Sequence, residues 1–190
     1  MMKKGSVTIH LHKPDVSEMI FFFLCGVVIS VPLTLFIYQY TDALLVGLSP
    51  AAIALISQVL IAPFIEEFSK AYPIFYRHGE TQRSIFELAV LVGLGFGLVE
   101  MLTYVTVLGV DLTYRLPGLF FHPASTSLTA YGVTIRQPIP YYLMAVSLHL
   151  TNNYFALTHT FSYVVSVFVV TITVLASWQL YNKTKEKIVI

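Results

Sequence analysis

The sequence predicts an all-α membrane protein, a polytopic bundle of about six transmembrane helices in which the fourth segment is irregular. Composition is the first reason, because 56% of the 190 residues are hydrophobic and only 11% are charged, whereas soluble domains carry about 25% charged residues. The second reason is a series of apolar runs that are long enough to cross a bilayer. The net charge of +1 and the high apolar fraction exclude a disordered, collagen-like or nucleic-acid-binding chain.

The first span follows a polar segment, residues 1–17. The apolar run from residue 19 to residue 40 has the length of a full span, about 22 residues. A basic start before an apolar run also suggests a signal peptide. This run is too long for a typical signal-peptide core and no A-x-A-like cleavage site follows it, so we interpret it as a retained first helix.

The second and third spans have recognisable local signals. Ser49 and Pro50 are typical of a helix N-cap and a first helical residue, and apolar residues continue from them to Tyr76. The third span is expected over residues 84–109. It contains Gly93 and Gly97, a small-xxx-small pair that lets a neighbouring helix approach closely.

The fourth segment, residues 113–135, is interrupted by Pro117-Gly118 and by Pro123, which predicts irregular backbone. Such backbone at membrane depth is tolerated only where it is buried in protein or lines a wet cavity. Residues 139–159 and 161–181 are expected to form the fifth and sixth spans.

The basic residues support an even number of spans, which places both chain ends on one side of the membrane. The opposite loops hold only Arg115, whereas the side of the two chain ends holds Lys3, Lys4, Lys13, Arg77, Arg83, Arg136, Lys183, Lys185 and Lys187. By the positive-inside rule, both termini are expected in the cytoplasm. We therefore predict a cytoplasmic segment over 1–17, one transmembrane domain over 18–181 and a basic cytoplasmic tail over 182–190.

Several polar residues lie within the predicted spans rather than at their ends. They are Glu66, Glu67, Lys70, Glu100, His122, His149 and Asn153. Each carboxylate or ammonium there costs about 2.5–3.5 kcal/mol on insertion scales, so keeping four of them requires partners and usually a function. At about 1.5 Å of rise per residue, the distances from the cytoplasmic end are roughly 15 Å for Glu66 and His149, 20 Å for His122 and 24 Å for Glu100. Four helices therefore offer polar groups at similar depths.

The two adjacent glutamates are expected to have different roles. Residues three or four apart share a helix face, so Lys70 lies on a face with both Glu66 and Glu67. The two glutamates point about 100° apart, so one faces the cavity while the other orients a neighbour. The spacing does not distinguish them, and an ion pair with a purely structural role is the alternative.

The two histidines also have structural interpretations. His122 precedes Pro123 and could be a helix N-cap, whereas His149 and Asn153 share a helix face and could be hydrogen-bonding glue between helices. Only the agreement in depth across four helices favours a common site.

The residue types fit hydrolysis. A carboxylate can take a proton from water, imidazoles can bind a metal or stabilise an oxyanion, and an amide can donate to one. Asp15, Asp42 and Asp111 are the only aspartates and all lie in predicted loops or termini, which excludes an intramembrane aspartyl protease. H-E-x-x-H and G-x-S-x-G motifs are absent, and the single cysteine, Cys25, excludes a disulfide framework.

Four short motifs follow one another on separate predicted spans, between about residue 62 and residue 157. They read Glu66-Glu67-Phe-Ser-Lys70, Phe96-Gly-Leu-Val-Glu100, His122-Pro-Ala-Ser-Thr126 and His149-Leu-Thr-Asn-Asn153. In this order they resemble the PrsW-type intramembrane proteases, relatives of the CAAX-processing and bacteriocin-self-protection (ABI) membrane proteases. Met101 departs from the family pattern, which often has Asn after the second-motif glutamate.

The resemblance implies a membrane-embedded endopeptidase, described as a metalloprotease, with a transmembrane or membrane-proximal protein as substrate. It implies that Glu66, alone or with Glu67, activates water and that Asn153 donates to the oxyanion. The implied zinc ligands are Glu66, Glu100, His122 and His149. The histidines could instead polarise the carbonyl in a metal-free mechanism, in which Glu100 orients a histidine. Lys70 and Phe96 are expected to support the site.

Two rival functions remain open from the sequence. A non-catalytic membrane scaffold or assembly subunit would keep the polar residues as interhelical glue. A proton-coupled transporter would use them as a proton relay, with the broken segment near Pro117 as a discontinuous helix, but the chain has no pseudo-symmetric second half.

Overall fold

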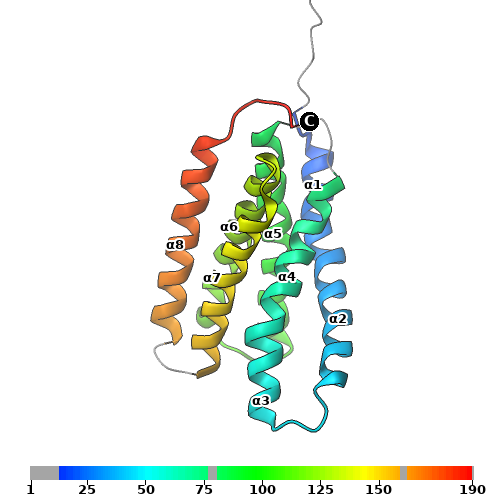
Figure 1. The fold of residues 1–190 in the computed structure, drawn as a ribbon, viewed down its shortest axis with the longest axis vertical. Helices are drawn as coiled ribbons and strands as arrows, with labels where there is room; N and C mark the ends of the chain where they lie inside the picture. The colour runs from blue at the N-terminus through cyan, green and yellow to red at the C-terminus, as the bar shows by residue number, and fades with distance from the viewer. Residues whose placement is uncertain (1–12, 77–80, 159–161, 190) are drawn as a thin grey trace, which may run out of the picture.

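The computed structural model describes residues 13–76, 81–158 and 162–189, and in these ranges the chain is helical, with one isolated bridge between Thr81 and Ile188 as its only β-type pairing. The first rod of the bundle in Figure 1 consists of α1 (Val16–Cys25), the π-helical turn η1 (Gly26–Ser30) and α2 (Val31–Leu44). The second consists of α3 (Pro50–Ala54), the π-helical η2 (Leu55–Ile61), α4 (Ala62–Ala71) and the 3₁₀ turn η3 (Tyr72–Tyr76). Four single helices follow: α5 (Gln82–Thr106), α6 (Leu112–Thr134), α7 (Pro138–Thr158) and α8 (Ser162–Lys183). The predicted all-α bundle of six helical segments is confirmed.

The first two rods begin where their capping residues lie. Asp15 accepts a hydrogen bond from the backbone N–H of Glu18, and the Glu18 carboxylate accepts one in return. This capping box starts α1 three residues before the apolar run predicts. Ser49 caps α3 through the N–H of Ala52, with Pro50 as first helical residue, as its sequence predicts.

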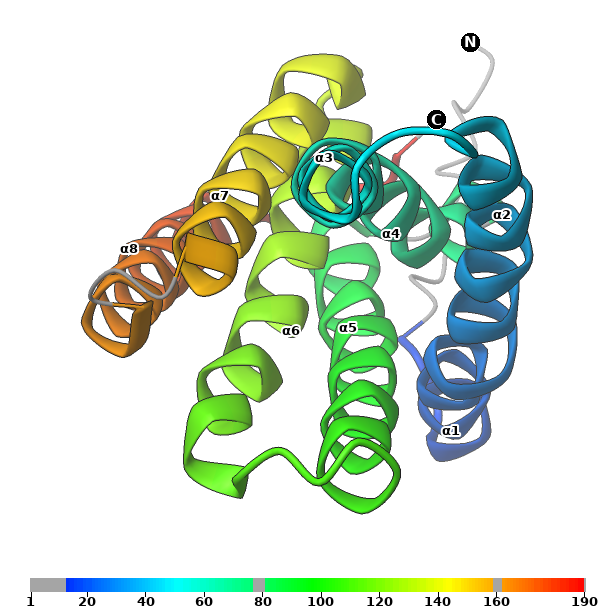
Figure 2. The same ribbon diagram turned by 90° about the horizontal axis from the view of Figure 1, so that it is seen from below.

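Helix α6 is the centre of the bundle. It packs against α5 on one side and against α7 and α8 on the other, while α1 covers the far side of α5 (Figures 1 and 2). Helix α4 contacts α2, α5, α6 and α7, so it closes the bundle between its two flanks. This arrangement brings α4, α5, α6 and α7 around one common interior.

Both described ends of the chain lie at the same end of the bundle, as an even number of spans requires (Figure 1). Arg83, at the start of α5, donates to the Thr184 carbonyl beyond α8, and Arg136 and Lys187 line one pocket at this end. The basic residues named here therefore lie at the end of the bundle that holds both described chain ends, as predicted. Residues 1–12 and 77–80, which include Lys3, Lys4 and Arg77, lie outside the described residues, and the side of the membrane stays a prediction.

Four of the six segments are both long and apolar enough to cross a membrane. They are Val16–Thr41, Pro50–Phe75, Gln82–Thr106 and Tyr163–Lys183. Helices α6 and α7 have 23 and 21 residues, enough for a span, but they are less apolar. In α6 the polar residues Ser125, Thr126, Ser127 and Thr129 are all buried against neighbouring helices, so its polarity faces protein rather than lipid.

The fourth segment is not irregular, contrary to the sequence prediction. Helix α6 runs without a break through Pro117 and Pro123. Each proline removes one backbone hydrogen bond, whereas unwinding the segment would free many more at membrane depth. His122 consequently lies inside α6 and is not an N-cap.

The close approach predicted from the third span is present between α5 and α6. A Cβ atom at Gly93 would lie 2.4 Å from the backbone oxygen of His122 and 2.5 Å from the Cα of Pro123. At Gly97 it would lie 3.2 Å from the His122 ring. Because Gly93 and Gly97 have no side chains, α5 leaves room for His122 at the interface with α6.

Candidate active site

Glu67 is the centre of a buried polar cluster formed by α4, α6 and α7. Its side chain and that of Lys70, one turn later on α4, are both fully buried, and Lys70 Nζ lies 2.6 Å from Glu67 Oε1. The same oxygen accepts a 3.2 Å hydrogen bond from Ser125 Oγ on α6 and lies 2.8 Å from His149 Nδ1 on α7. One carboxylate oxygen therefore joins three helices.

A second pair of a carboxylate and an imidazole, Glu100 of α5 and His122 of α6, lies on the other side of Lys70. His122 Nδ1 is 2.9 Å from Lys70 Nζ, and His122 Nε2 is hydrogen-bonded to Glu100 Oε2. An ammonium only donates, so Nδ1 must accept and the ring proton must be on Nε2, where it points at the carboxylate. Lys70 thus links the Glu67–His149 pair to the Glu100–His122 pair.

Arg115 extends this chain toward the surface. Its Nη2 donates to Glu100 Oε1 at 2.5 Å, and its guanidinium lies 3.6 Å from the centroid of the Tyr104 ring. The side chains of Arg115 and Glu100 are 24% and 21% exposed, whereas that of His122 is 4% exposed. The Glu100 carboxylate is therefore the point at which the buried cluster meets the outside.

The two glutamates of α4 have different surroundings. Glu67 is fully buried and its Oε1 contacts Lys70, Ser125 and His149. The Glu66 side chain is 12% exposed, and its Oε2 lies 3.6 Å from His149 Nε2. That distance is too long for a direct hydrogen bond. Glu66 Oε2 is itself buried, so a water molecule can hydrogen-bond to both atoms only after the two side chains move slightly apart.

Aromatic rings enclose the cluster. Lys70 Nζ lies 5.2 Å from the ring centroid of Phe96 and 5.8 Å from that of Phe121, distances at which the ring faces attract a cation. Phe96 also contacts the His122 ring, and Phe121 contacts both histidine rings. Phe96, expected to support the site, lies directly against it.

The amide of Asn153 is directed to the backbone of η2. Ala62 N–H bonds to the Ser57 carbonyl in the π-helical pattern, and Pro63 has no N–H, so the Gln58 carbonyl loses both its α-helical and its π-helical donor. Asn153 Nδ2 donates to this carbonyl at 2.9 Å. An amide NH₂ has two hydrogens, so this contact uses one of them.

The structure brings six of the expected residues together: Glu66, Glu67, Lys70, Glu100, His122 and His149. Sequence reasoning missed two members. Ser125 lies inside the third motif, three residues and so about one helical turn after His122, but it was not singled out as a site residue. Arg115 was interpreted as an ordinary loop residue, because no pattern in the sequence places it beside Glu100.

The histidines and glutamates are donor types that zinc prefers, but their arrangement does not fit a metal ion. Within residues 13–76, 81–158 and 162–189, no three such side chains converge as a ligand group. The Lys70 ammonium lies between Glu67 and His122, and both ring nitrogens of His122 have partners. A divalent cation at this position would have to displace Lys70, because two cations would repel strongly in a buried site.

Comparison with known proteins gives one match. Residues 15–178 match the family described as "PrsW family intramembrane metalloprotease". No curated protein and no solved structure matches the chain. Since the family match covers most of the chain, including all four spans that contribute to the cluster, the protein belongs to the PrsW family of intramembrane metalloproteases.

Proposed function

We propose that this protein is an endopeptidase that hydrolyses a peptide bond in or near the bilayer with a water molecule activated by Glu66. The observation that carries the proposal is that the carboxylate of Glu66, the less buried of the two glutamates, lies 3.6 Å from His149 Nε2. A small displacement of either side chain admits a water molecule that hydrogen-bonds to both. Membership of an intramembrane protease family supports the reaction type.

The roles of the two glutamates follow from their contacts. Glu66 accepts a proton as the water oxygen attacks the carbonyl carbon, and the same proton passes to the amide nitrogen when the C–N bond breaks. Glu67 is a positioning residue, because its Oε1 accepts the Nδ1–H of His149 and so leaves Nε2 directed at the water. Lys70 contacts the same oxygen and holds the Glu67 carboxylate in place.

The remaining members orient and stabilise. Glu100 fixes the His122 ring, and His122 in turn accepts a hydrogen bond from Lys70. The second N–H of Asn153 is the amide donor for the oxyanion, while the first keeps η2 against α7. The expected substrate is a transmembrane or membrane-proximal protein segment, and both termini are expected in the cytoplasm.

Zinc enters no step of this mechanism. The family description suggests a metal, and the sequence-based expectation was a zinc site of Glu66, Glu100, His122 and His149. The Lys70 contacts argue against such a site. We expect hydrolysis to survive exhaustive dialysis against a chelator. Stoichiometric zinc that disappears in His149→Ala, together with chelator-sensitive cleavage, would contradict this mechanism.

The decisive variant is Glu66→Gln, which keeps the shape of the side chain and removes the base. We expect hydrolysis of membrane-spanning peptides in proteoliposomes to fall at least about 100-fold, with little change in thermal stability, since the Glu66 side chain is partly exposed. A scaffold predicts the reverse, a lower melting temperature and no protease activity in any variant. Undiminished cleavage by Glu66→Gln would refute the assignment of the base.

A further inference from the structure

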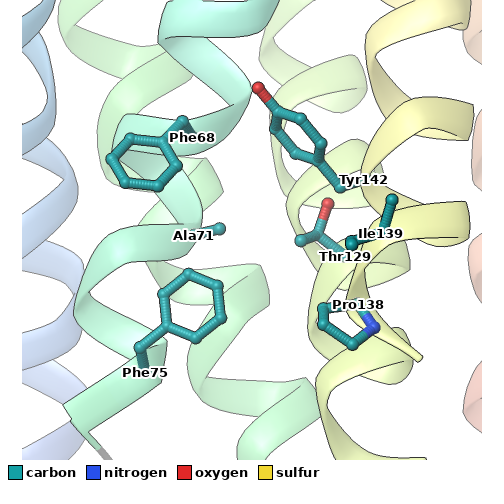
Figure 3. A pocket seen from close by; sticks show the side chains of 7 residues that line it. All are labelled: Phe68, Ala71, Phe75, Thr129, Pro138, Ile139 and Tyr142. Carbon is teal, nitrogen blue, oxygen red and sulfur yellow. The ribbon is translucent and has the colours of Figure 1, made fainter. Parts of the chain in front are cut away.

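A groove with a volume of about 210 Å³ opens between α4 and α7. Phe68, Ala71 and Phe75 line it from α4 and η3, whereas Thr129, Ile139 and Tyr142 line it from α6 and α7 (Figure 3). A cavity of about 150 Å³ in another protein holds a benzene ring, and pockets for drug-sized molecules start near 300 Å³. The groove therefore has the size of one large apolar side chain.

The groove continues from the polar cluster along three helices. The related positions are Glu67 with Ala71, Ser125 with Thr129, and His149 with Tyr142. Four or seven residues along a helix return to the same face, about 6 or 10 Å away. Helices α4 and α6 run in one direction and α7 in the other (Figure 1), so all three displacements lead toward the same end of the bundle.

This offset has a direct meaning for a bound peptide. An extended chain advances about 3.3 Å per residue, so a side chain in the groove is two or three residues from a peptide bond at the cluster. The groove also faces the surrounding lipid, because Phe68, Phe75 and Ile139 are 47%, 43% and 69% exposed. A membrane-spanning segment can reach it laterally.

Thr129 indicates that the occupant has polar groups. Its side chain is 1% exposed and lines the groove, and its hydroxyl has no hydrogen-bond partner among the described residues. Other threonines in the bundle, such as Thr126 and Thr173, donate to the carbonyl four residues earlier. A lipid chain offers nothing to the Thr129 hydroxyl, whereas a peptide backbone offers both a donor and an acceptor.

We propose that this groove is a specificity pocket that binds one large apolar side chain, such as Leu, Met or Phe, of a membrane-spanning substrate segment, two or three residues from the scissile bond. The stated distance from the scissile bond rests on the proposed protease function. The binding of the peptide itself can be measured without cleavage.

Binding is tested by photo-crosslinking in phosphatidylcholine proteoliposomes that contain the full chain with Glu66→Gln. The probe is a synthetic, lysine-flanked Leu/Ala peptide of about 22 residues, with one photo-reactive phenylalanine in its core. We expect crosslinks, mapped by mass spectrometry, on α4 and α7 at the groove. Ala71→Leu, which fills the groove, should lower their yield at least about 10-fold. Ile172→Ala, at a lipid-exposed position of α8, should not.

Two results would overturn the proposal. Crosslinks spread over all lipid-facing helices would mean that the groove does not select the peptide. A photo-reactive phosphatidylcholine that labels the groove and is not displaced by excess peptide would identify it as a lipid site.

A second variant covers the case in which Ala71→Leu fails to fold. Ile139 is exposed, so Ile139→Ala widens the groove without disturbing the core. With the Glu66 carboxylate present, Ile139→Ala should shift the preferred residue from Leu toward Phe or Trp at one fixed distance from the cut. The expected change in the ratio of cleavage rates is about 10-fold, and an unchanged profile contradicts the pocket.

The two proposals fail in different ways. Crosslinking at the groove without hydrolysis by the unmodified chain would keep the peptide-binding site and refute the protease. Hydrolysis whose sequence preference is the same in Ile139→Ala and in Ile172→Ala would keep the protease and refute the pocket.

Discussion

The Lys70–Glu67 pair offers a stringent test of how the cluster is held together. Both side chains are 0% exposed, and Lys70 Nζ lies 2.6 Å from Glu67 Oε1, 2.9 Å from His122 Nδ1 and 3.2 Å from Ser125 Oγ. Lys70→Met removes the ammonium and leaves the Glu67 carboxylate buried without its cation. Breaking a buried ion pair in this way costs about 3–5 kcal/mol of unfolding free energy. Glu67→Gln leaves the ammonium buried and is expected to cost a similar amount.

The double variant separates the pair from its surroundings. Lys70→Met with Glu67→Gln removes both charges, so we expect it to be at least about 2 kcal/mol more stable than the sum of the single effects predicts. The measurement is reversible unfolding in mixed micelles with increasing dodecyl sulfate, followed by circular dichroism. Lys183→Met, at an exposed position of α8, is the control and should change stability by less than about 0.5 kcal/mol.

Two outcomes would refute this reasoning. If Lys70→Met cost less than about 1 kcal/mol, the ammonium would not be compensating a buried carboxylate. If the effects of the two single variants added up in the double variant, the two side chains would not interact, whatever their separation.

Three further predictions follow from particular contacts. Gly93→Ala places a methyl group 2.4 Å from the His122 backbone oxygen, so it should lower unfolding stability by about 1–3 kcal/mol, whereas Gly118→Ala, with its nearest contact at 4.0 Å, should not; equal effects in the two variants would contradict the close approach. Arg115→Gln removes the cation from Glu100, and we expect cleavage to fall about 10- to 100-fold with an unchanged melting temperature; a proportionate loss of stability would indicate a purely structural role. Hydrogen bonds from the hydroxyl and the N–H of Thr113 lower the pKa of Asp111, the N-cap of α6. The Asp111 carboxylate therefore contributes its full stability above the unfolded-state pKa of about 4, and this contribution is lost as the pH falls through the lower folded-state pKa. Amide hydrogen exchange at the start of α6 should become faster over that pH range, whereas in Asp111→Ala the exchange rate there should not respond to the loss of this carboxylate.

The sequence predicted the fold well because membrane insertion depends on length and hydrophobicity. The first and second rods, α5 and α8 are apolar enough to cross a membrane by composition alone. The prediction of irregular backbone in the fourth segment was wrong, since the rule that proline breaks helices applies best to helices exposed to water. In α6 Pro117 is buried inside the bundle and Pro123 is half-buried, which makes a continuous helix the better solution.

The sequence predicted which residues form the site better than it predicted how they are arranged. Charged and imidazole side chains at membrane depth are costly, so Glu66, Glu67, Lys70, Glu100 and His149 stood out without any structure. Ser125 did not, because a serine in a span costs little and occurs widely as helix glue.

By itself, the sequence determined which segments are helices and the order in which they follow one another, since both depend on hydrophobic length. The rotation of each helix about its own axis depends on packing between helices, and only the tertiary structure decided it. That rotation places Glu67 against Lys70 and His149 and leaves the Glu66 carboxylate 3.6 Å from His149 Nε2. It also turns Thr129 into the groove. The π-helical turn before Pro63 likewise decides that Asn153 bonds to a backbone carbonyl, because a break in one helix creates an acceptor that only a neighbouring helix can satisfy.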